Sequence, residues 1–149
     1  MARRLSVAFI STLLVFGLTG GIAWAHGDCS LRIWEPFTSG VLGTTMNAKA
    51  KFTCTEPHAR LAIRVKLQAL GLRGFFDADI MNDSNTQTKS VSAQPHHRCF
   101  VTDTGVDDVW RTQVVYTRVF NASGALIAEH SSDVIRNSDP VQSSCLFAT

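Results

Sequence analysis

Apolar and polar residues alternate with a period of two in several segments of the chain. Residues 44–54 place apolar side chains on one face: Met46, Ala48, Ala50, Phe52 and Cys54. Residues 61–68 repeat the pattern with Leu61, Ile63, Val65 and Leu67. Because successive side chains of a β-strand point to opposite faces, each segment predicts a strand with one buried and one solvent-facing side.

Shorter alternations and turn signals predict the rest of the fold. Residues 29–34 alternate in the same way, and residues 109–120 are apolar on both faces, which is typical of a central strand. Asn121 to Gly124 predicts a turn that leads into a further strand at 125–134, and short strands are expected at 97–101 and 143–147. Breaks are predicted at residues 35–36, 39–40, 56–57, 71–74, 77–85, 103–108 and 137–140. About seven short strands without a convincing amphipathic helix predict an all-β fold, an antiparallel immunoglobulin-like β-sandwich.

The first 25 residues predict a cleaved secretory signal peptide. Arg3 and Arg4 precede an apolar run over residues 5–18, and Ala23-Trp24-Ala25 is a small-x-small cleavage site. Residues 26–149 are then expected to form a single disulfide-stabilised β-sandwich domain. No cysteine lies at the cleavage site for a lipid, and the C-terminal end is too short to anchor the chain. We therefore expect a secreted, extracellular protein without a stable membrane anchor.

The four cysteines fit an oxidising compartment, because their number is even and none forms a CxxC pair. They predict two disulfides, for which three connectivities are possible. We favour Cys29–Cys54 with Cys99–Cys145, because each pair joins predicted strands of the same half of the chain.

Charge and composition narrow the function classes. The chain has 14 Lys and Arg against 12 Asp and Glu, and removal of Arg3 and Arg4 leaves 12 against 12. A neutral surface without a basic run argues against nucleic acid as a partner. The chain contains no GxSxG, HExxH, phosphate-binding or dinucleotide motif, and we expect a protein that is not an enzyme.

The layout of the chain resembles that of small secreted two-disulfide β-sandwich proteins of actinobacteria without an assigned function. The shared features are the signal peptide, the early cysteine pair, the strand at residues 61–67, Cys99, the Trp-Arg-Thr strand at 110–112, the turn at Gly124 and the terminal Cys145. The resemblance implies a secreted β-sandwich and brings no catalytic residues with it.

A histidine at the predicted mature N-terminus suggests a metal site. His26-Gly27 resembles the start of copper-dependent polysaccharide monooxygenases and periplasmic copper-binding sandwiches, whose histidine brace uses the terminal amine and imidazole nitrogens. The resemblance implies that copper is held by His26 with a second histidine, and the sequence leaves the choice open among His58, His96, His97 and His130. Otherwise no cofactor is expected.

Two polar segments carry weaker signals. Residues 77–85 gather oxygen ligands suited to calcium, but Met81 and Asn82 break the EF-hand pattern, so we interpret the segment as a solvated loop. Asp103-Thr-Gly105 resembles the active-site loop of retroviral-type aspartic proteases. Thr102 stands where that family has an apolar residue, and no second motif follows, which favours a polar turn.

These observations lead to three hypotheses for function. The first is a secreted non-enzymatic protein that binds an extracellular protein or a small ligand, with Trp34, Phe75 and Phe76 as a candidate binding patch. The alternative is a copper-binding protein that uses His26. A further alternative is a secreted protease inhibitor that presents a loop within residues 71–85.

Overall fold

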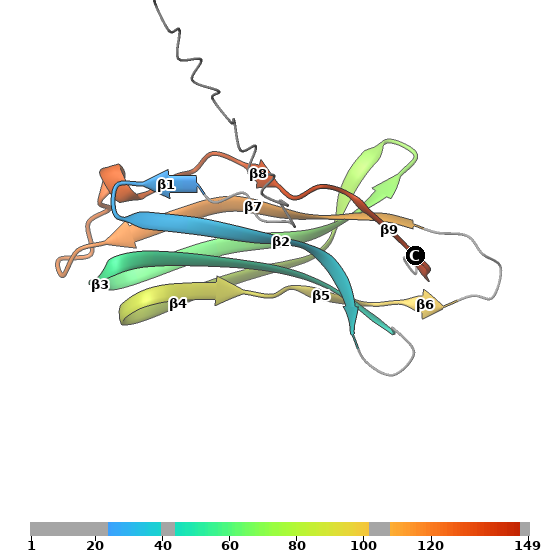
Figure 1. Ribbon diagram of the computed structural model, residues 1–149, viewed down its shortest axis with the longest axis horizontal. Helices are drawn as coiled ribbons and strands as arrows, with labels where there is room; N and C mark the ends of the chain where they lie inside the picture. Colours follow the sequence, from blue (N-terminus) through green and yellow to red (C-terminus); the bar gives the residue numbers. More distant parts are fainter. Residues whose placement is uncertain (1–23, 40–43, 102–107, 147–149) are drawn as a thin grey trace, which may run out of the picture.

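The computed structural model describes residues 24–39, 44–101 and 108–146, and this part of the chain is almost entirely β-structure (Figure 1). Residues 1–23 of the expected signal peptide and the loop at Asp103 lie outside the described residues, whereas the last two residues of that peptide, Trp24 and Ala25, belong to the first strand. The strands are β1 (Trp24–His26), β2 (Cys29–Ser39), β3 (Thr45–Gly71), β4 (Gly74–Ala93), β5 (His96–Arg98), β6 (Phe100–Val101), β7 (Asp108–Phe120), β8 (Arg136–Asn137), β9 (Val141–Ser143) and β10 (Cys145–Leu146), with a 3-10 helix η2 at Ala128–His130. Every strand pairing in this part of the chain is antiparallel, which confirms the prediction of an all-β, antiparallel fold. None of the described segments is a helix of the length and hydrophobicity needed to cross a membrane.

The long hairpin of β3 and β4 organises the fold. The first half of β3 pairs with β2 along one edge and with the end of β4 and with β5 along the other. Its second half pairs with β7 and with the start of β4, and β7 in turn pairs with β8 and β9. At the left of Figure 1 the hairpin doubles back on itself, so that its two halves belong to two packed layers. The short strands β6 and β10 pair separately.

A bulge in β3 changes which side chains are buried. From Thr53 to His58 the chain advances five residues while β4 advances only two, from Ser90 to Thr88. Successive side chains of a strand point to opposite faces, so an insertion of three residues, an odd number, moves every later side chain of β3 to the opposite face. Even-numbered residues such as Phe52 are buried before the bulge, and odd-numbered residues such as Leu61 are buried after it. Both predicted alternations are therefore correct, in one strand instead of two.

Two of the predicted breaks were wrong, and each of them contains a proline. Residues 35–36 and 56–57 were expected to end strands, but β2 continues through Pro36 and β3 continues through Pro57. In both places the pairing register shifts, between Trp34 and Phe37 and between Thr53 and His58. Proline has no N–H to donate, and a bulge is a position at which the ladder does not need one.

Two further expectations are corrected by the pairing. The predicted loop at residues 77–85 is part of strand β4, in which Asp83 lies opposite Ile63 and Met81 lies opposite Val65. Residues 125–134 do not form the predicted strand and make only isolated bridges around η2. There the hydroxyl of Ser131 accepts a hydrogen bond from the Val119 N–H and donates to the Ile127 carbonyl, so a side chain replaces part of the strand ladder.

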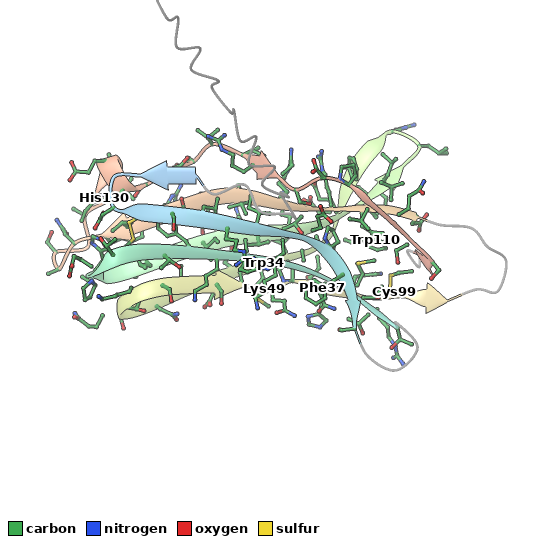
Figure 2. The ribbon with its side chains drawn as sticks, viewed as in Figure 1. Trp34, Phe37, Lys49, Cys99, Trp110 and His130 are labelled. Carbon is green, nitrogen blue, oxygen red and sulfur yellow. A yellow bond between two sulfur atoms is a disulfide. The ribbon has the colours of Figure 1, made fainter. Side chains whose placement is uncertain are left out.

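The core lies between the two layers and is fixed at both ends by disulfides. Trp110 of β7 is fully buried, and its indole N–H donates to the carbonyl of Cys145 at 2.9 Å. The structure contains the favoured disulfides Cys29–Cys54 and Cys99–Cys145. Figure 2 shows Cys99 at one end of the molecule and His130, which neighbours Cys29, at the other.

Candidate functional site

An open groove lies on the outer face of the layer formed by β3, β4 and β7. Its central residue is Ala62, which pairs with Arg118 of β7 on one side and with Ser84 of β4 on the other. The small side chain of Ala62 leaves a hollow of about 290 Å³. The lining residues are Arg60, Ala62, Asn82, Asp83, Ser84, Tyr116, Arg118 and Phe120. The groove is therefore built by the solvent-facing side of strands whose opposite side forms the core.

Aromatic rings of β7 hold the arginines of this groove in place. The guanidinium carbon of Arg60 lies 3.9 Å from the ring centroid of Phe120, and that of Arg118 lies 4.3 Å from the ring of Tyr116. Arg64 approaches the ring of Tyr116 at 5.9 Å. Cation–π contact of this kind orients a guanidinium without neutralising its charge.

The three arginines differ in their acidic partners. Arg118 donates two hydrogen bonds of 3.0 Å to Asp133, and these bonds lower the pKa of Asp133 and raise that of Arg118. Neither Arg60 nor Arg64 forms an ion pair within the described part of the chain. The Nε of Arg64 is also buried without a hydrogen-bond partner there. Arg60, which lines the groove, and Arg64, which lines a neighbouring hollow, are thus two cationic groups without an acidic partner among the described residues.

A bulge in β7 extends the groove. Arg64 pairs with Tyr116 and Val65 pairs with Val114, so Val115 is the extra residue. Val115 lines a second hollow of about 400 Å³, which shares Tyr116 and Arg118 with the first. β-Bulges are common beside binding sites because they redirect neighbouring side chains.

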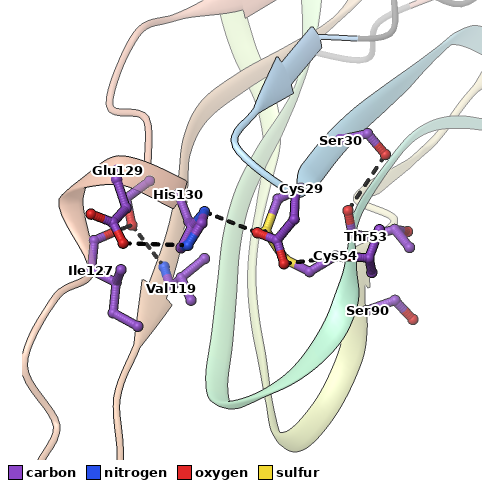
Figure 3. Close-up of a disulfide and its surroundings, with 12 residues drawn as sticks. Cys29, Ser30, Thr53, Cys54, Ser90, Val119, Ile127, Glu129 and His130 are labelled. Atoms are coloured by element: carbon purple, nitrogen blue, oxygen red, sulfur yellow. Dashed lines mark hydrogen bonds and ion pairs between the residues drawn. A yellow bond between two sulfur atoms is a disulfide. The ribbon is translucent and has the colours of Figure 1, made fainter.

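A second cluster of polar side chains surrounds the Cys29–Cys54 disulfide (Figure 3). Nδ1 of His130, at the end of η2, lies 3.0 Å from Oδ1 of Asp28 in the turn between β1 and β2. The other carboxylate oxygen of Asp28 accepts a hydrogen bond from the Thr55 hydroxyl at 3.1 Å. Burial acts to raise the pKa of Asp28, but the Thr55 hydrogen bond and the charges of His130 and His58 outweigh it and lower that pKa.

His58 completes this histidine cluster, which consists of Asp28, His58 and His130. The ring centroids of His58 and His130 are 5.5 Å apart. A nitrogen of His58 lies within 4.8 Å of both disulfide sulfurs, and a nitrogen of His130 lies within 4.8 Å of the Cys29 sulfur. The two imidazoles therefore flank the same disulfide.

The histidines expected as metal ligands are divided between two regions. His26 lies in β1, where its backbone pairs with Cys29 at the end of the molecule that carries His130. His96 and His97 lie on β5, opposite Asn47 and Met46 of β3, and the ring of His97 contacts the buried Trp110. His130 thus lies beside His58, whereas His97 lies against the core residue Trp110.

The aromatic residues of the expected binding patch lie in two places, Trp34 on β2 and the adjacent Phe75 and Phe76 on β4. Trp34 of β2 is half-buried, and its ring is contacted by the cationic groups of Arg32 and Lys49. Figure 2 shows Trp34 beside Lys49. Phe75 and Phe76 begin β4, beside the β3–β4 turn that stands out at the upper right of Figure 1. Phe75 is covered by Arg111 at 4.0 Å.

The sequence analysis did not identify the groove. The pattern Arg60, Ala62, Arg64 along one strand face was a usable signal, because it puts two cations on either side of a small residue. The partners on β7 follow from the strand register, which the sequence pattern does not specify. A comparison of the chain with protein-family models, with curated proteins and with solved structures found no significant match.

Proposed function

We propose that the chain is a secreted, non-enzymatic protein of immunoglobulin-like sandwich architecture that binds the carboxylate or phosphate group of an extracellular ligand in the groove around Ala62. The observation that carries the proposal is the pair Arg60 and Arg64, which line two adjoining hollows and have no acidic partners among the described residues. Guanidinium groups present a fork of N–H donors that matches these oxyanions.

The charge balance favours a small anion or a short acidic segment over a long polyanion. The two hollows are lined by three arginines and by the carboxylates of Asp83 and Asp133. The two hollows therefore carry a small net positive charge. The rest of the chain does not extend it, because the chain is neutral once Arg3 and Arg4 are removed. Long polyanions require an extended basic surface. The two disulfides are typical of the oxidising compartment in which such a ligand would be met.

Titration followed by backbone amide NMR tests this proposal. The probes are glucuronate and inorganic phosphate, with glucose as the neutral counterpart of glucuronate. We expect the acids to shift amides of β3 and β7 around Ala62, and glucose to leave them unchanged. Arg64→Gln should weaken the binding by about tenfold or more, since hydrogen bonds to charged groups contribute about 1.5–3 kcal/mol.

Arg32→Gln is the matched control, because Arg32 also lies over an aromatic ring, that of Trp34, but on the other layer. It should leave the titration unchanged. Equal binding by the Arg64 and Arg32 variants, or no shift around Ala62 with either acid, contradicts the proposal.

Copper binding through His26 is kept as a second candidate. One observation favours it: the backbone next to His26, at Gly27, lies against the imidazole of His130. A terminal amine at His26 would thus start close to a second nitrogen ligand. Copper titration of the chain that begins at His26 tests this candidate, and copper affinity that is unchanged by His26→Ala would end it.

A further inference from the structure

The histidine cluster has the arrangement of metal ligands rather than that of an ordinary ion pair. Nδ1 of His130 and Oδ1 of Asp28 are only 3.0 Å apart, yet this nitrogen makes no well-aligned hydrogen bond with any described residue. Two atoms that bind the same metal are also about 3 Å apart, and both are directed at the ion instead of at each other. A short but misaligned contact is therefore what co-ligands produce.

The position of His58 agrees with this interpretation. Its Nε2 is buried and has no hydrogen-bond partner in the described residues. A buried nitrogen without a partner is costly, and ligation is one way to satisfy it. Two imidazoles that bind one ion at about 2.0–2.1 Å in tetrahedral geometry have ring centroids roughly 5 Å apart. The rings of His58 and His130 are separated by 5.5 Å.

Neighbouring groups fix the orientation of His130. Oε1 of Glu129 lies 3.6 Å from Nε2, the nitrogen that is directed away from Asp28. A carboxylate at the second nitrogen of a ligating histidine holds the ring and selects its tautomer. Gly27 gives the imidazole its space, because a Cβ at this position would lie 2.6 Å from Nδ1.

We propose that His130, Asp28 and His58 bind a zinc ion beside the Cys29–Cys54 disulfide, without any contribution from His26. Two imidazoles and one carboxylate are a common zinc ligand set, and water occupies the fourth position. His58 would have to rotate to join the other two ligands, because its nitrogen lies within 4.8 Å of the disulfide sulfurs but is not grouped with the Asp28 carboxylate and the His130 imidazole. The cysteine sulfurs are joined to each other and do not ligate. The ion would link the β1–β2 turn, the bulge of β3 and η2.

Calorimetric titration of the oxidised full chain with Zn²⁺ tests the proposal, with Co²⁺ absorption as a spectroscopic measure of tetrahedral nitrogen and oxygen ligation. We expect one ion per chain. His130→Gln and His58→Gln should each lower the affinity by about tenfold or more, and Asp28→Asn should act in the same direction. His96→Ala is the matched control, because His96 is exposed on β5 at a distance from the cluster.

His26→Ala separates this site from a terminal brace, and it should leave zinc affinity unchanged. Loss of zinc in the His26 variant, unchanged affinity in the His58 variant, or failure of the native chain to bind Zn²⁺ overturns the proposal. Thermal unfolding of each variant without metal identifies any that does not fold. If a histidine variant does not fold, the zinc affinity of Asp28→Asn, which keeps the shape of the side chain, tests the proposal instead. Glucuronate binding should be the same in all these variants, so the groove and the zinc site are tested independently.

Discussion

The imidazole of His130 packs against the backbone of Gly27, so closely that a Cβ on residue 27 would meet Nδ1 at 2.6 Å and Cε1 at 2.8 Å. Gly27 also has a φ of +58°, in the left-handed region that glycine adopts without strain. Gly27 thus has two roles. It adopts the backbone conformation of the β1–β2 turn, and its lack of a side chain leaves space for His130, which contacts Asp28. The turn and η2 are packed as one unit at this end of the molecule.

The first prediction concerns this contact. Gly27→Ala should destabilise the protein by more than the roughly 1–2 kcal/mol of left-handed strain, because the added methyl group displaces His130. The free energy of unfolding in urea measures the effect. Gly124→Ala is the control, since Gly124 has a φ of +83° and a Cβ added there would have nothing within 4 Å. Equal costs in the two variants would show that the His130 contact contributes nothing.

Much of the fold could be predicted from the sequence, because burial on one side leaves a period of two that needs no partner to be recognised. The alternation around Phe52 and around Leu61 identified buried faces correctly. It could not show that both segments belong to one strand. Pro57 normally argues for a break, and only the register of β4 reveals a bulge that accommodates it.

The candidate sites were less predictable, because they depend on pairs from distant elements. His130 was among the expected ligands, but its neighbours come from distant elements: His58 lies at the bulge of β3, and Asp28 lies in the β1–β2 turn. Likewise, Arg60 is oriented by Phe120 across the β3–β7 ladder. Residues 77–85 were misassigned since an outer strand face rich in Asp and Asn has the composition of a loop.

The second prediction concerns the two disulfides, which close loops with sequence separations of 25 and 46. Loop closure in the unfolded chain predicts a loss of about 3.5 kcal/mol for the Cys29,Cys54→Ala variant and about 4 kcal/mol for Cys99,Cys145→Ala. Chemical unfolding of the two double variants measures both losses. Zinc affinity should fall only in the first variant, whose bond lies beside His58. A Cys99,Cys145→Ala variant with native stability would contradict the loop-closure argument.

The third prediction concerns Trp110, the largest fully buried side chain among the described residues. Trp110→Phe removes the indole N–H that donates to the Cys145 carbonyl and leaves that acceptor without its partner. We expect a loss of about 1–3 kcal/mol from the unpaired carbonyl, in addition to the lost packing. Trp34→Phe, on the half-buried outer face of β2, should cost much less. The denaturant midpoints of the two variants measure these losses of stability. A similar loss in both would show that the hydrogen bond of the buried Trp110 indole N–H does not stabilise the fold.

The last prediction follows from the polar network on the outer face of β3. Asp77 accepts hydrogen bonds from Lys66 at 2.6 Å and from Gln68 at 2.7 Å. Burial acts to raise the pKa of Asp77, but the bonds from Lys66 and Gln68 and the charge of Lys66 lower it on balance. A carboxyl whose pKa is lower in the folded state than in the unfolded state stabilises the fold when it is ionised.

The sign of the pH dependence is then fixed. The contribution of Asp77 is complete above the unfolded-state pKa of about 3.9, and it disappears as the pH falls through the lower pKa of the folded state. Asp77→Asn should therefore cost up to about 1 kcal/mol at pH 7, the range of a partly exposed ion pair, and should cost less and less below pH of about 4. Asp139→Asn is the control, because Asp139 is exposed and forms no ion pair within the described part of the chain. Urea unfolding at a series of pH values measures both variants, and a cost that persists at the lowest pH would assign the effect to packing instead of to the charge of Asp77.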